Sequence, residues 1–280
     1  MQVVNTVQQF RDLCRQGSRP LGLVPTMGAL HDGHLSLVRQ ARVECATVAV
    51  TIFVNPAQFA AHEDLGRYPQ TMDRDLLLLR EADTDLVFLP PVAEVYPPDF
   101  ATTVGVAGPA LPLEGEARPG HLAGVATIVT KLLHMAAPDL TYFGQKDAQQ
   151  VAVVKRLVAD LNIPVRVRVM PTVREPDGLA MSSRNAYLSA EERAAATVVY
   201  RGLQAARQLY LQGERRRAAL EDACRSLLGS ERLVRHIDYA ALVDPDSFAS
   251  AGPVVERPYL LAVAVHIGST RLIDNVLLGP

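Results

Sequence analysis

Two histidines three residues apart, His31 and His34, end a Gly-rich turn that begins at Pro25. A short apolar run at 21–24 precedes the turn, and apolar residues at helical spacing follow it. A strand, a turn and a helix in this order present free backbone N–H groups to an anion. Imidazoles placed there can donate hydrogen bonds to phosphate oxygens, and as cations they would neutralise charge on a phosphoryl group. The pattern predicts a phosphate site, but the spacing alone also fits one histidine that caps the helix and one that is exposed.

Two later turns carry further cations. Lys146 and Asp147 follow a predicted strand at 140–143, where an ammonium is well placed for a phosphate and a carboxylate can accept from a ribose hydroxyl. Asp147 fits equally well as a plain helix N-cap. The string Met-Ser-Ser-Arg at 181–184 offers two hydroxyls and a guanidinium, which make a compact anion clamp or, equally, a surface loop.

Neutral polar side chains follow another predicted strand, at 47–54. Asn55 and Gln58 offer donors and acceptors that suit the hydroxyls and carboxylate of a small polar substrate. Ligands in open α/β sheets gather at the carboxyl ends of strands, where these residues lie. The alternative is a turn stabilised by the Asn-Pro pair.

The first two thirds of the chain alternate short apolar runs with amphipathic segments, which predicts βαβ units and a Rossmann-like parallel sheet with helices on both faces. Strands are expected at 21–24, 47–54, 85–89, 140–143 and 165–169. Helices are expected at 34–45, 71–82, 125–136 and 148–161.

A stretch rich in Pro and Gly, 90–120, interrupts this alternation. A loop of this length inside a compact domain is usually a lid, a binding loop or an interface. Arg118 and His121 end it, and they either close over a bound phosphate or are solvated.

The pattern changes after about residue 173, where helices are followed by strands. We therefore expect a Rossmann-like domain at 1–175 and a smaller α+β domain at 176–280. The second domain is predicted to contain helices at 190–211 and 215–228 and strands at 236–243, 259–267 and 271–276.

Composition narrows the function classes. The formal net charge of −2 gives no general attraction to nucleic acid or to a membrane surface. Three widely spaced cysteines, Cys14, Cys45 and Cys224, argue against a disulfide framework and a structural zinc site. The first ten residues lack the pattern of a signal peptide, and no apolar run approaches about 18 residues, so we expect a soluble, cytoplasmic protein. The only lysines are Lys131, Lys146 and Lys155, which makes each worth attention because arginine does not replace a compact ammonium.

The His-x-Gly-His and Met-Ser-Ser-Arg turns together resemble the paired signatures of the HIGH/KMSKS nucleotidyltransferase superfamily, which includes class I aminoacyl-tRNA synthetases and small adenylyl- and cytidylyltransferases. Five longer strings resemble, in their order and spacing, the pantothenate synthetase (pantoate–β-alanine ligase) family: PTMGALHDGHLSLV, FVNPAQF, RPGHLAGVATIVTKL, FGQKDAQQ and GLAMSSRN. The resemblance runs from about residue 21 to 189 and more loosely to the C-terminus. It departs at Asp32, where Glu is common, at Ala57, where Thr is common, and at Pro176.

This resemblance implies an enzyme that adenylates pantoate with ATP, releases pyrophosphate, and lets the amine of β-alanine displace AMP to form pantothenate. Negative charge builds at the α-phosphorus during the first step, so pre-placed cations and donors are needed and no nucleophilic Cys or Ser is required. Mg²⁺ is expected to bridge the phosphates. A homodimer is expected, with the C-terminal domain hinged as a lid.

The resemblance also assigns roles to individual residues. His34 would be the proton donor, His31 would assist at the phosphates, Lys146 would stabilise the transferring phosphoryl group, and Arg184 would close on the triphosphate. ATP would be bound by Met27, Gly28, Ala29, Leu30, His31, Asp32, Gly33, His34, Gly144, Gln145, Lys146, Asp147, Val173, Met181, Ser182, Ser183 and Arg184. Pantoate would be bound by Gln58, which also meets β-alanine, and by Gln150. Asn55, Arg118 and His121 are further candidates at the site, and Asp75 is the candidate contact to Mg²⁺.

Two other functions remain open at this point. A cytidylyl- or adenylyltransferase of the same superfamily would form a dinucleotide-like product and no amide. A catalytically idle nucleotide-binding regulator would bind ATP and release no pyrophosphate with any acid. AMP formation that depends on β-alanine separates the ligase from both.

Overall fold

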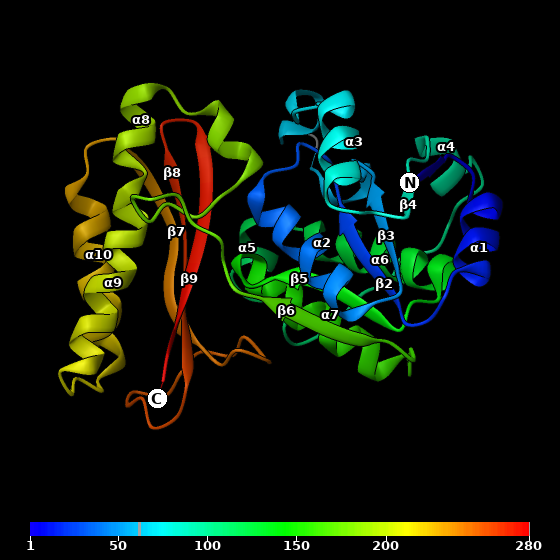
Figure 1. Ribbon diagram of the computed structural model, residues 1–280. Helices are drawn as coiled ribbons and strands as arrows, with labels where there is room; N and C mark the ends of the chain where they lie inside the picture. Colours follow the sequence, from blue (N-terminus) through cyan, green and yellow to red (C-terminus); the bar gives the residue numbers. More distant parts are fainter. Residues whose placement is uncertain (61–62, 280) are drawn as a thin grey trace.

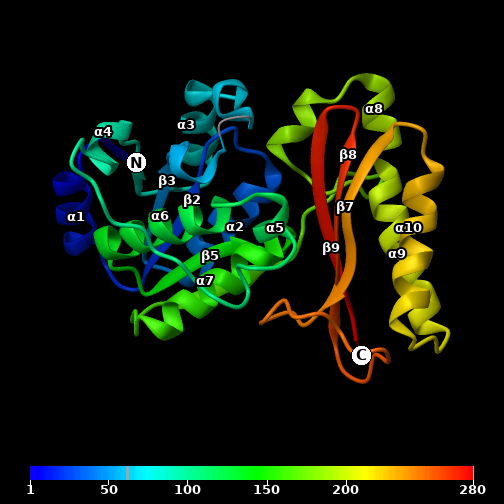
Figure 2. The same ribbon diagram turned by 180° about the vertical axis from the view of Figure 1, so that it is seen from behind.

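The structure is a computed structural model that describes residues 1–60 and 63–279. It contains two β-sheets, each with its own helices, which stand side by side (Figures 1 and 2). The larger sheet has six strands in the order β1-β4-β3-β2-β5-β6, and every pairing in it is parallel. The strands are β1 (Gln2–Val4), β2 (Leu21–Thr26), β3 (Thr47–Ile52), β4 (Leu86–Phe88), β5 (Leu140–Gly144) and β6 (Arg166–Met170). The predicted parallel α/β sheet is confirmed.

Helices cover both faces of this sheet because its strands are apolar on both sides. Leu21 and Leu23 pack with helices α1 (Val7–Gln16), α6 (His121–Ala136) and α7 (Ala148–Asp160). Val48 and Val50, which point the other way, pack with α2 (Asp32–Glu44) and α3 (Met72–Glu81). Each fully buried Leu or Val contributes about 2 kcal/mol relative to exposure. This two-sided burial fixes the register of the sheet and so the places where its strands end.

The smaller sheet is antiparallel, in the order β7 (Val234–Val243), β8 (Tyr259–Ile267) and β9 (Thr270–Leu278). One of its faces packs against helices α9 (Thr197–Leu211) and α10 (Arg217–Ser230). The other face, at Leu260 and Ala262, packs against Ala148 and Ala152 at the start of α7. The C-terminal sheet therefore lies directly against the end of the parallel sheet from which α7 begins (Figure 1).

Three details differ from the sequence-based expectations. The predicted helix at 190–211 is two helices, α8 (Ala190–Ala195) and α9, because the Thr197 hydroxyl donates to the carbonyl oxygen of Ala194 at the junction. The stretch 90–120 contains two single-turn helices, α4 (Val92–Val95) and α5 (Glu114–Ala117), which are too short for a periodic signal. The N-terminal β1 and α1 were not predicted, since β1 is a three-residue edge strand with little apolar pattern.

Within the two described ranges, none of the helices combines the length and the apolar character that crossing a bilayer requires.

Candidate active site

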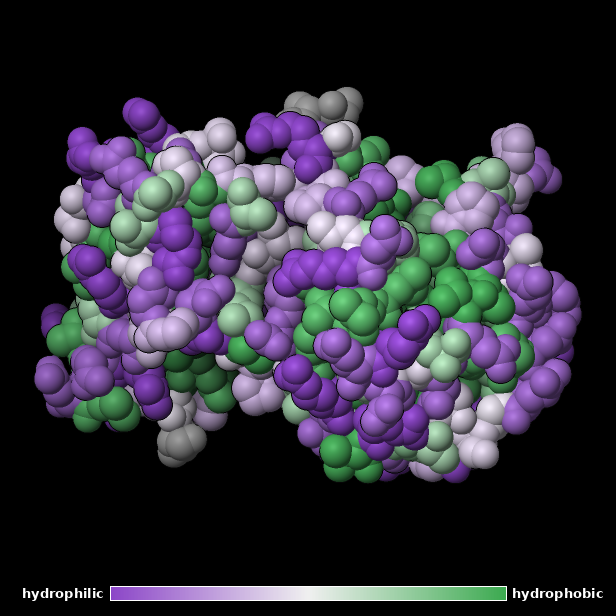
Figure 3. Space-filling view, turned by 45° about the horizontal axis from the view of Figure 1, so that its top comes forward, coloured by the Kyte–Doolittle hydropathy of each residue, from purple (hydrophilic) through white to green (hydrophobic). Residues whose placement is uncertain are grey.

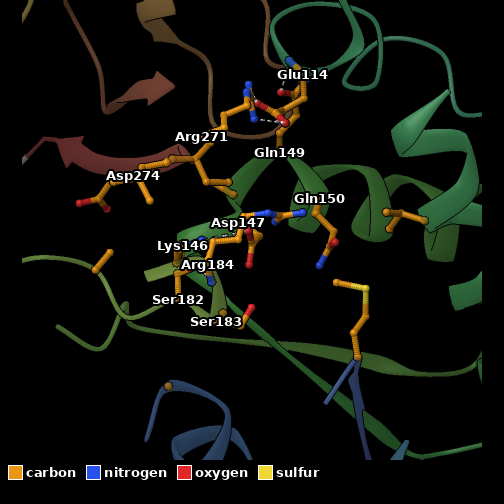
Figure 4. A pocket seen from close by; sticks show the side chains of 18 of the residues that line it. Glu114, Lys146, Asp147, Gln149, Gln150, Ser182, Ser183, Arg184, Arg271 and Asp274 are labelled. Atoms are coloured by element: carbon orange, nitrogen blue, oxygen red, sulfur yellow. Dashed lines mark hydrogen bonds and ion pairs between the residues drawn. The ribbon is translucent and has the colours of Figure 1, made fainter. Parts of the chain in front are cut away.

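A cavity of about 580 Å³ lies between the two sheets, and residues from both of them line it. The end of β2, the segments after β3 and β5, and the segment that joins the sheets all reach it. Figure 4 shows Lys146, Ser182, Ser183 and Arg184 around one space, with the amide of Gln150 directed toward it. The carboxyl ends of parallel strands are where this class of fold binds ligands.

The turn after β2 is stabilised by hydrogen bonds to the carboxylate of Asp75. This carboxylate is 1% exposed and accepts from the backbone N–H groups of Ala29 at 2.8 Å and Leu30 at 2.9 Å. The Thr71 hydroxyl also donates to it, at 2.9 Å. Gly28 has φ of +84°, and a Cβ there would lie 3.1 Å from Asp75, so glycine suits this position. The oxygens of Asp75 are buried and already engaged, which does not favour the predicted contact to Mg²⁺.

His31 and His34 form a reciprocal cap at the start of α2. The Nδ1 of His31 accepts from the Gly33 N–H at 3.2 Å, and the Nδ1 of His34 accepts from the His31 N–H at 3.4 Å. The network therefore assigns the remaining proton of each ring to Nε2. Both rings line the cavity, and their centroids are 4.1 Å apart.

Neither imidazole is cationic at neutral pH. Burial and the nearby Lys146 charge lower the pKa of His31 to about 4. Burial, the neighbouring His31 and Lys146 lower the pKa of His34 to about 3. Of the two predicted modes, this favours hydrogen-bond donation by neutral rings, each of which presents one N–H donor. The proton-donor role predicted for His34 is then a hydrogen bond from Nε2.

Lys146 lies in the 3-10 turn η3 (Gln145–Asp147) that follows β5, and its side chain is 18% exposed. Its ammonium is 3.5 Å from the carboxylate of Asp147. The C-terminal sheet holds this turn, because the side-chain amide of Asn275 on β9 donates to the carbonyl oxygens of Gln145 at 2.9 Å and Lys146 at 3.0 Å. Gln145 in turn donates to Asn275 at 3.2 Å, so the side chain predicted to bind ATP supports the turn from outside the cavity.

The segment that joins the two sheets brings a second cation to the cavity. Ser182 caps the 3-10 turn η4 (Ser183–Tyr187), and the Arg184 guanidinium forms two 3.0 Å hydrogen bonds with Asp64. Burial alone would raise the pKa of Asp64, but the hydrogen bonds from Arg184 lower it, so the pair stays ionic. Among residues 1–60 and 63–279, the hydrogen bonds of the Arg184 guanidinium use Nε and Nη2, so Nη1 could contact another anion. The predicted adenine contact, Val173, lines the cavity and accepts from the Met181 N–H at 3.0 Å.

Gln58 and Asn55 lie together after β3. Both Asn55 amide atoms are engaged, because Nδ2 donates to Gln58 Oε1 and to the Gly124 carbonyl oxygen, each at 3.1 Å. Its Oδ1 accepts from the Tyr96 hydroxyl at 2.8 Å and from the Ala57 N–H at 3.3 Å. The hydrogen-bonding capacity of Asn55 is used inside the protein, which does not favour the predicted contact with substrate.

The sequence model of the family described as Pantoate-beta-alanine ligase matches residues 2–277. The chain is 53% identical over 278 residues to a pantothenate synthetase from Roseiflexus castenholzii, with 99% of each chain covered. It is 52% identical to a pantothenate synthetase from Chloroflexus aurantiacus, with 99% of this chain and 98% of the relative covered. The chain belongs to the pantoate–β-alanine ligase family. It is an enzyme of this family, as the resemblance predicted.

Solved structures of the pantoate–β-alanine ligase family have the same fold. The crystal structure of pantothenate synthetase from Thermus thermophilus matches with a TM-score of 0.95 and 46% identity, and all of both chains is covered. A pantoate–β-alanine ligase from Francisella tularensis, described as complexed with β-γ ATP and β-alanine, matches with a TM-score of 0.80 and 33% identity. That match covers 99% of this chain and 97% of the other.

The cavity of this family member contains most of the residues that the sequence predicted for it. The predicted residues that line it are Met27, His31, Gly33, His34, Asn55, Gln58, Arg118, His121, Gly144, Lys146, Asp147, Gln150, Val173, Met181, Ser182, Ser183 and Arg184. The others support it from behind: Gly28, Ala29 and Leu30 form the Asp75-bound turn, Gln145 contacts β9, and Asp32 is exposed beside Arg39.

Arg118 and His121 are partly buried at the cavity, and each has a partner within the protein. Arg118 forms a two-point ion pair with Glu63, at 2.6 and 2.8 Å. His121 Nδ1 lies 2.9 Å from the Gln58 carbonyl oxygen, which assigns its proton to Nδ1. Burial and the Arg118 charge lower the pKa of His121 to about 4. His121 therefore fixes the backbone of the residue that presents an amide to the cavity.

Several residues at the site were missed from the sequence. Asp64, the partner of Arg184, carried no spacing signal because its helical turn is only four residues long. Glu114 on α5 joins the two sheets, with Arg271 as an ion-pair partner and a 2.6 Å hydrogen bond from the Tyr239 hydroxyl. Asn275 did have a signal: with Asp274 it separates two apolar runs within β9, a pattern that favours a specific polar contact.

Proposed function

We propose that this cavity binds ATP and pantoate together and then β-alanine, and that the reaction passes through an enzyme-bound pantoyl-adenylate. In the first step a pantoate carboxylate oxygen attacks the α-phosphorus, and the bond to the bridging oxygen of pyrophosphate breaks. In the second step the β-alanine amine attacks the acyl carbon, and the carbon–oxygen bond to AMP breaks. The amine loses one proton, and AMP leaves as a phosphate monoester.

His31, His34, Lys146 and Arg184 would serve the first step. Each imidazole donates its Nε2–H to a phosphate oxygen, and the ammonium of Lys146 stabilises the charge that develops on the transferring group. Arg184 keeps Asp64 and offers Nη1 to the triphosphate. Support for this proposal comes from the convergence of these four groups, from three distant segments of the chain, on one cavity.

Gln58 and Gln150 would bind pantoate. The carboxamide of Gln58 has its NH₂ group available on the cavity side, since Oε1 accepts from Asn55. The side chain of Gln150, in the first turn of α7, points toward the same cavity (Figure 4). Two neutral amides can bind the polar groups of pantoate without forming an ion pair with its carboxylate. A carboxylate oxygen therefore remains available as the nucleophile.

Mg²⁺ fits this site as a companion of ATP. No group of three or more His, Cys, Asp or Glu side chains that could hold a metal occurs in residues 1–60 and 63–279. Mg²⁺ in ATP sites is commonly held by one or two carboxylates and the phosphates themselves. Asp147 supplies one half-exposed carboxylate beside Lys146, and the ion would neutralise phosphate charge there.

We also propose that residues 176–280 act as a hinged lid on residues 1–175 and that the chain forms a homodimer. The contacts of Asn275 and Arg271 with the N-terminal half are polar, which suits a movable interface. Figure 3 shows apolar surface gathered on the N-terminal half, which favours an interface there. Exposed large apolar side chains of that half are Met1, Val3, Val43, Leu65, Leu77, Val92, Leu111 and Leu161. Light scattering behind gel filtration measures the mass of the assembly.

The deciding experiment labels both carboxylate oxygens of pantoate with ¹⁸O and analyses the AMP formed with ATP and β-alanine. One ¹⁸O in the AMP phosphate is expected, because the acyl-phosphate oxygen stays with phosphorus when the amine attacks carbon. Without β-alanine, about one pyrophosphate per active site is expected, and AMP should not accumulate. Unlabelled AMP, or AMP release that ignores β-alanine, would refute the proposal.

A further inference from the structure

Tyr96 lies at the end of α4, outside the residues that line the cavity, yet its ring packs against Phe53 of the cavity and its hydroxyl bonds to the site. Its hydroxyl donates to Asn55 Oδ1 at 2.8 Å, the shorter of the two hydrogen bonds that this oxygen accepts. Burial raises the pKa of Tyr96 to about 12, so the hydroxyl keeps its proton at neutral pH. The mechanism above gives this side chain no role.

Backbone groups fix which way round the Asn55 amide lies. The Gly124 carbonyl oxygen must face Nδ2, and the Ala57 N–H must face Oδ1, because neither group can change its character. Asn55 is 1% exposed, so water does not compete for either atom. The only role left for a hydroxyl 2.8 Å from Oδ1 is that of a donor.

The orientation of the Asn55 amide determines the orientation of the Gln58 amide. Since Asn55 Nδ2 is a donor, the Gln58 atom at 3.1 Å from it must be Oε1. The NH₂ group of Gln58 is then directed toward Met27, with Nε2 3.0 Å from Sδ, on the cavity side. A reversed Gln58 amide would place its NH₂ group against the NH₂ group of Asn55. The NH₂ group of Gln58 therefore faces the cavity as a hydrogen-bond donor.

Tyr96 is itself held in place by aromatic and cationic neighbours. The Phe100 ring packs edge-on at 5.0 Å between centroids, and Lys131 Nζ lies 5.6 Å from the Tyr96 ring and 4.3 Å from the Phe100 ring. Lys131 on α6 therefore makes cation–π contacts with the rings of both Tyr96 and Phe100. The ring is fixed independently of its hydroxyl, so removing only the oxygen is a clean perturbation.

We propose that Tyr96 is a positioning residue for pantoate, which acts through Asn55 to hold the Gln58 amide with its NH₂ group toward the substrate. The inference rests on the proposed role of Gln58 in pantoate binding. Tyr96→Phe leaves Oδ1 of Asn55 with the 3.3 Å bond alone. The backbone groups still set the orientation of the amide, but Asn55 and the Gln58 amide bonded to it are held less firmly in place. The loss of one buried hydrogen bond corresponds to an increase of about tenfold in the KM for pantoate.

The test is a double-mutant cycle of Tyr96→Phe and Gln58→Ala. In all four proteins, steady-state kinetics gives kcat and the KM values for pantoate and ATP, and calorimetric titration gives the affinity for pantoate. Tyr96→Phe alone should raise the pantoate KM about tenfold, change kcat by less than about threefold and leave the KM for ATP unaltered. In the Gln58→Ala background the same change should add less than about twofold. Tyr210→Phe on α9, outside the cavity, is the control and should have no effect.

The outcomes separate this inference from the proposed function. If Gln58→Ala leaves pantoate affinity unchanged, the assignment of Gln58 fails and Tyr96 loses its role with it. If Gln58→Ala weakens pantoate but Tyr96→Phe does not, or if the two effects are fully additive, only the positioning role of Tyr96 is overturned. Equal increases in both KM values together with a lower melting temperature would mark Tyr96 as merely structural and also overturn it.

Discussion

Acid should destabilise this protein through three histidines that the fold keeps neutral. His31, His34 and His121 have pKa values of about 4, 3 and 4, all lowered first by burial. In the unfolded chain each returns to about 6.5. Between these values the unfolded chain binds more protons than the folded one, so stability falls as the pH decreases from about 6.5 toward 4.

The size of the effect follows from these values. At pH 5, the difference between a pKa of 6.5 and one of 4 or below favours unfolding by about 2 kcal/mol for each histidine. Three such groups together amount to about 6 kcal/mol, which is a large part of the stability of an ordinary domain, about 5–15 kcal/mol. At pH 7.5 the contribution is close to zero, because the imidazoles are neutral in both states.

His121→Asn isolates one of the three. Asparagine retains an N–H donor for the Gln58 carbonyl oxygen but does not titrate. Urea unfolding at pH 7.5 and 5.0 should show that the variant loses about 2 kcal/mol less than the parent protein over this interval. His236, whose side chain is 69% exposed, provides the control, and His236→Asn should lose as much as the parent. An identical pH loss in His121→Asn and the parent would refute the reasoning, since background carboxylates are common to both.

Further predictions concern the site residues. Lys146→Ala and, separately, His34→Ala should lower the rate of pyrophosphate release by about two orders of magnitude or more with folding intact. A near-wild-type rate removes that residue from the mechanism. Gln150→Ala should raise the steady-state KM for pantoate much more than that for ATP, and equal losses contradict its assignment. Asp75→Asn should cost about 2 kcal/mol of unfolding free energy in urea, because one amide oxygen replaces two acceptors. The Mg²⁺ requirement of that variant should not change, and a shifted requirement would restore the metal role. Gly124→Ala should raise the pantoate KM by about tenfold or more, since its Cβ would lie 2.2 Å from a carbonyl oxygen of the 3-10 turn η1 (Pro56–Gln58).

Apolar runs and strand-turn-helix order were sufficient to predict the parallel sheet and most of the cavity. Runs such as Leu21–Val24 are buried on both faces, so their sequence signal is strong and local. The turn with His31 and the turn with Lys146 follow such strands directly. Strand ends therefore placed these residues at one edge of the sheet on the evidence of the sequence alone.

What the sequence did not provide is the partner of each polar group. Asp75 was a candidate metal contact as a carboxylate on a helix of the N-terminal half, yet its oxygens accept from two backbone N–H groups 45 and 46 residues away in the chain. Asn55 was a candidate substrate contact because it follows a strand and carries donors and acceptors, yet its amide is bonded to Gln58 and to the Gly124 carbonyl oxygen. The charge of His31 and His34 depends on burial, which is a tertiary property that spacing does not report.

The two hydrogen bonds from Asn275 to the turn that carries Lys146 couple that turn to movement of the C-terminal sheet. That turn belongs by sequence to the parallel sheet but takes two of its hydrogen bonds from the edge of the other one. Any swing of the C-terminal sheet away from β5 must either rupture those two bonds or drag the ammonium along with it. In the proposed lid motion, opening would therefore also disturb the turn that carries Lys146.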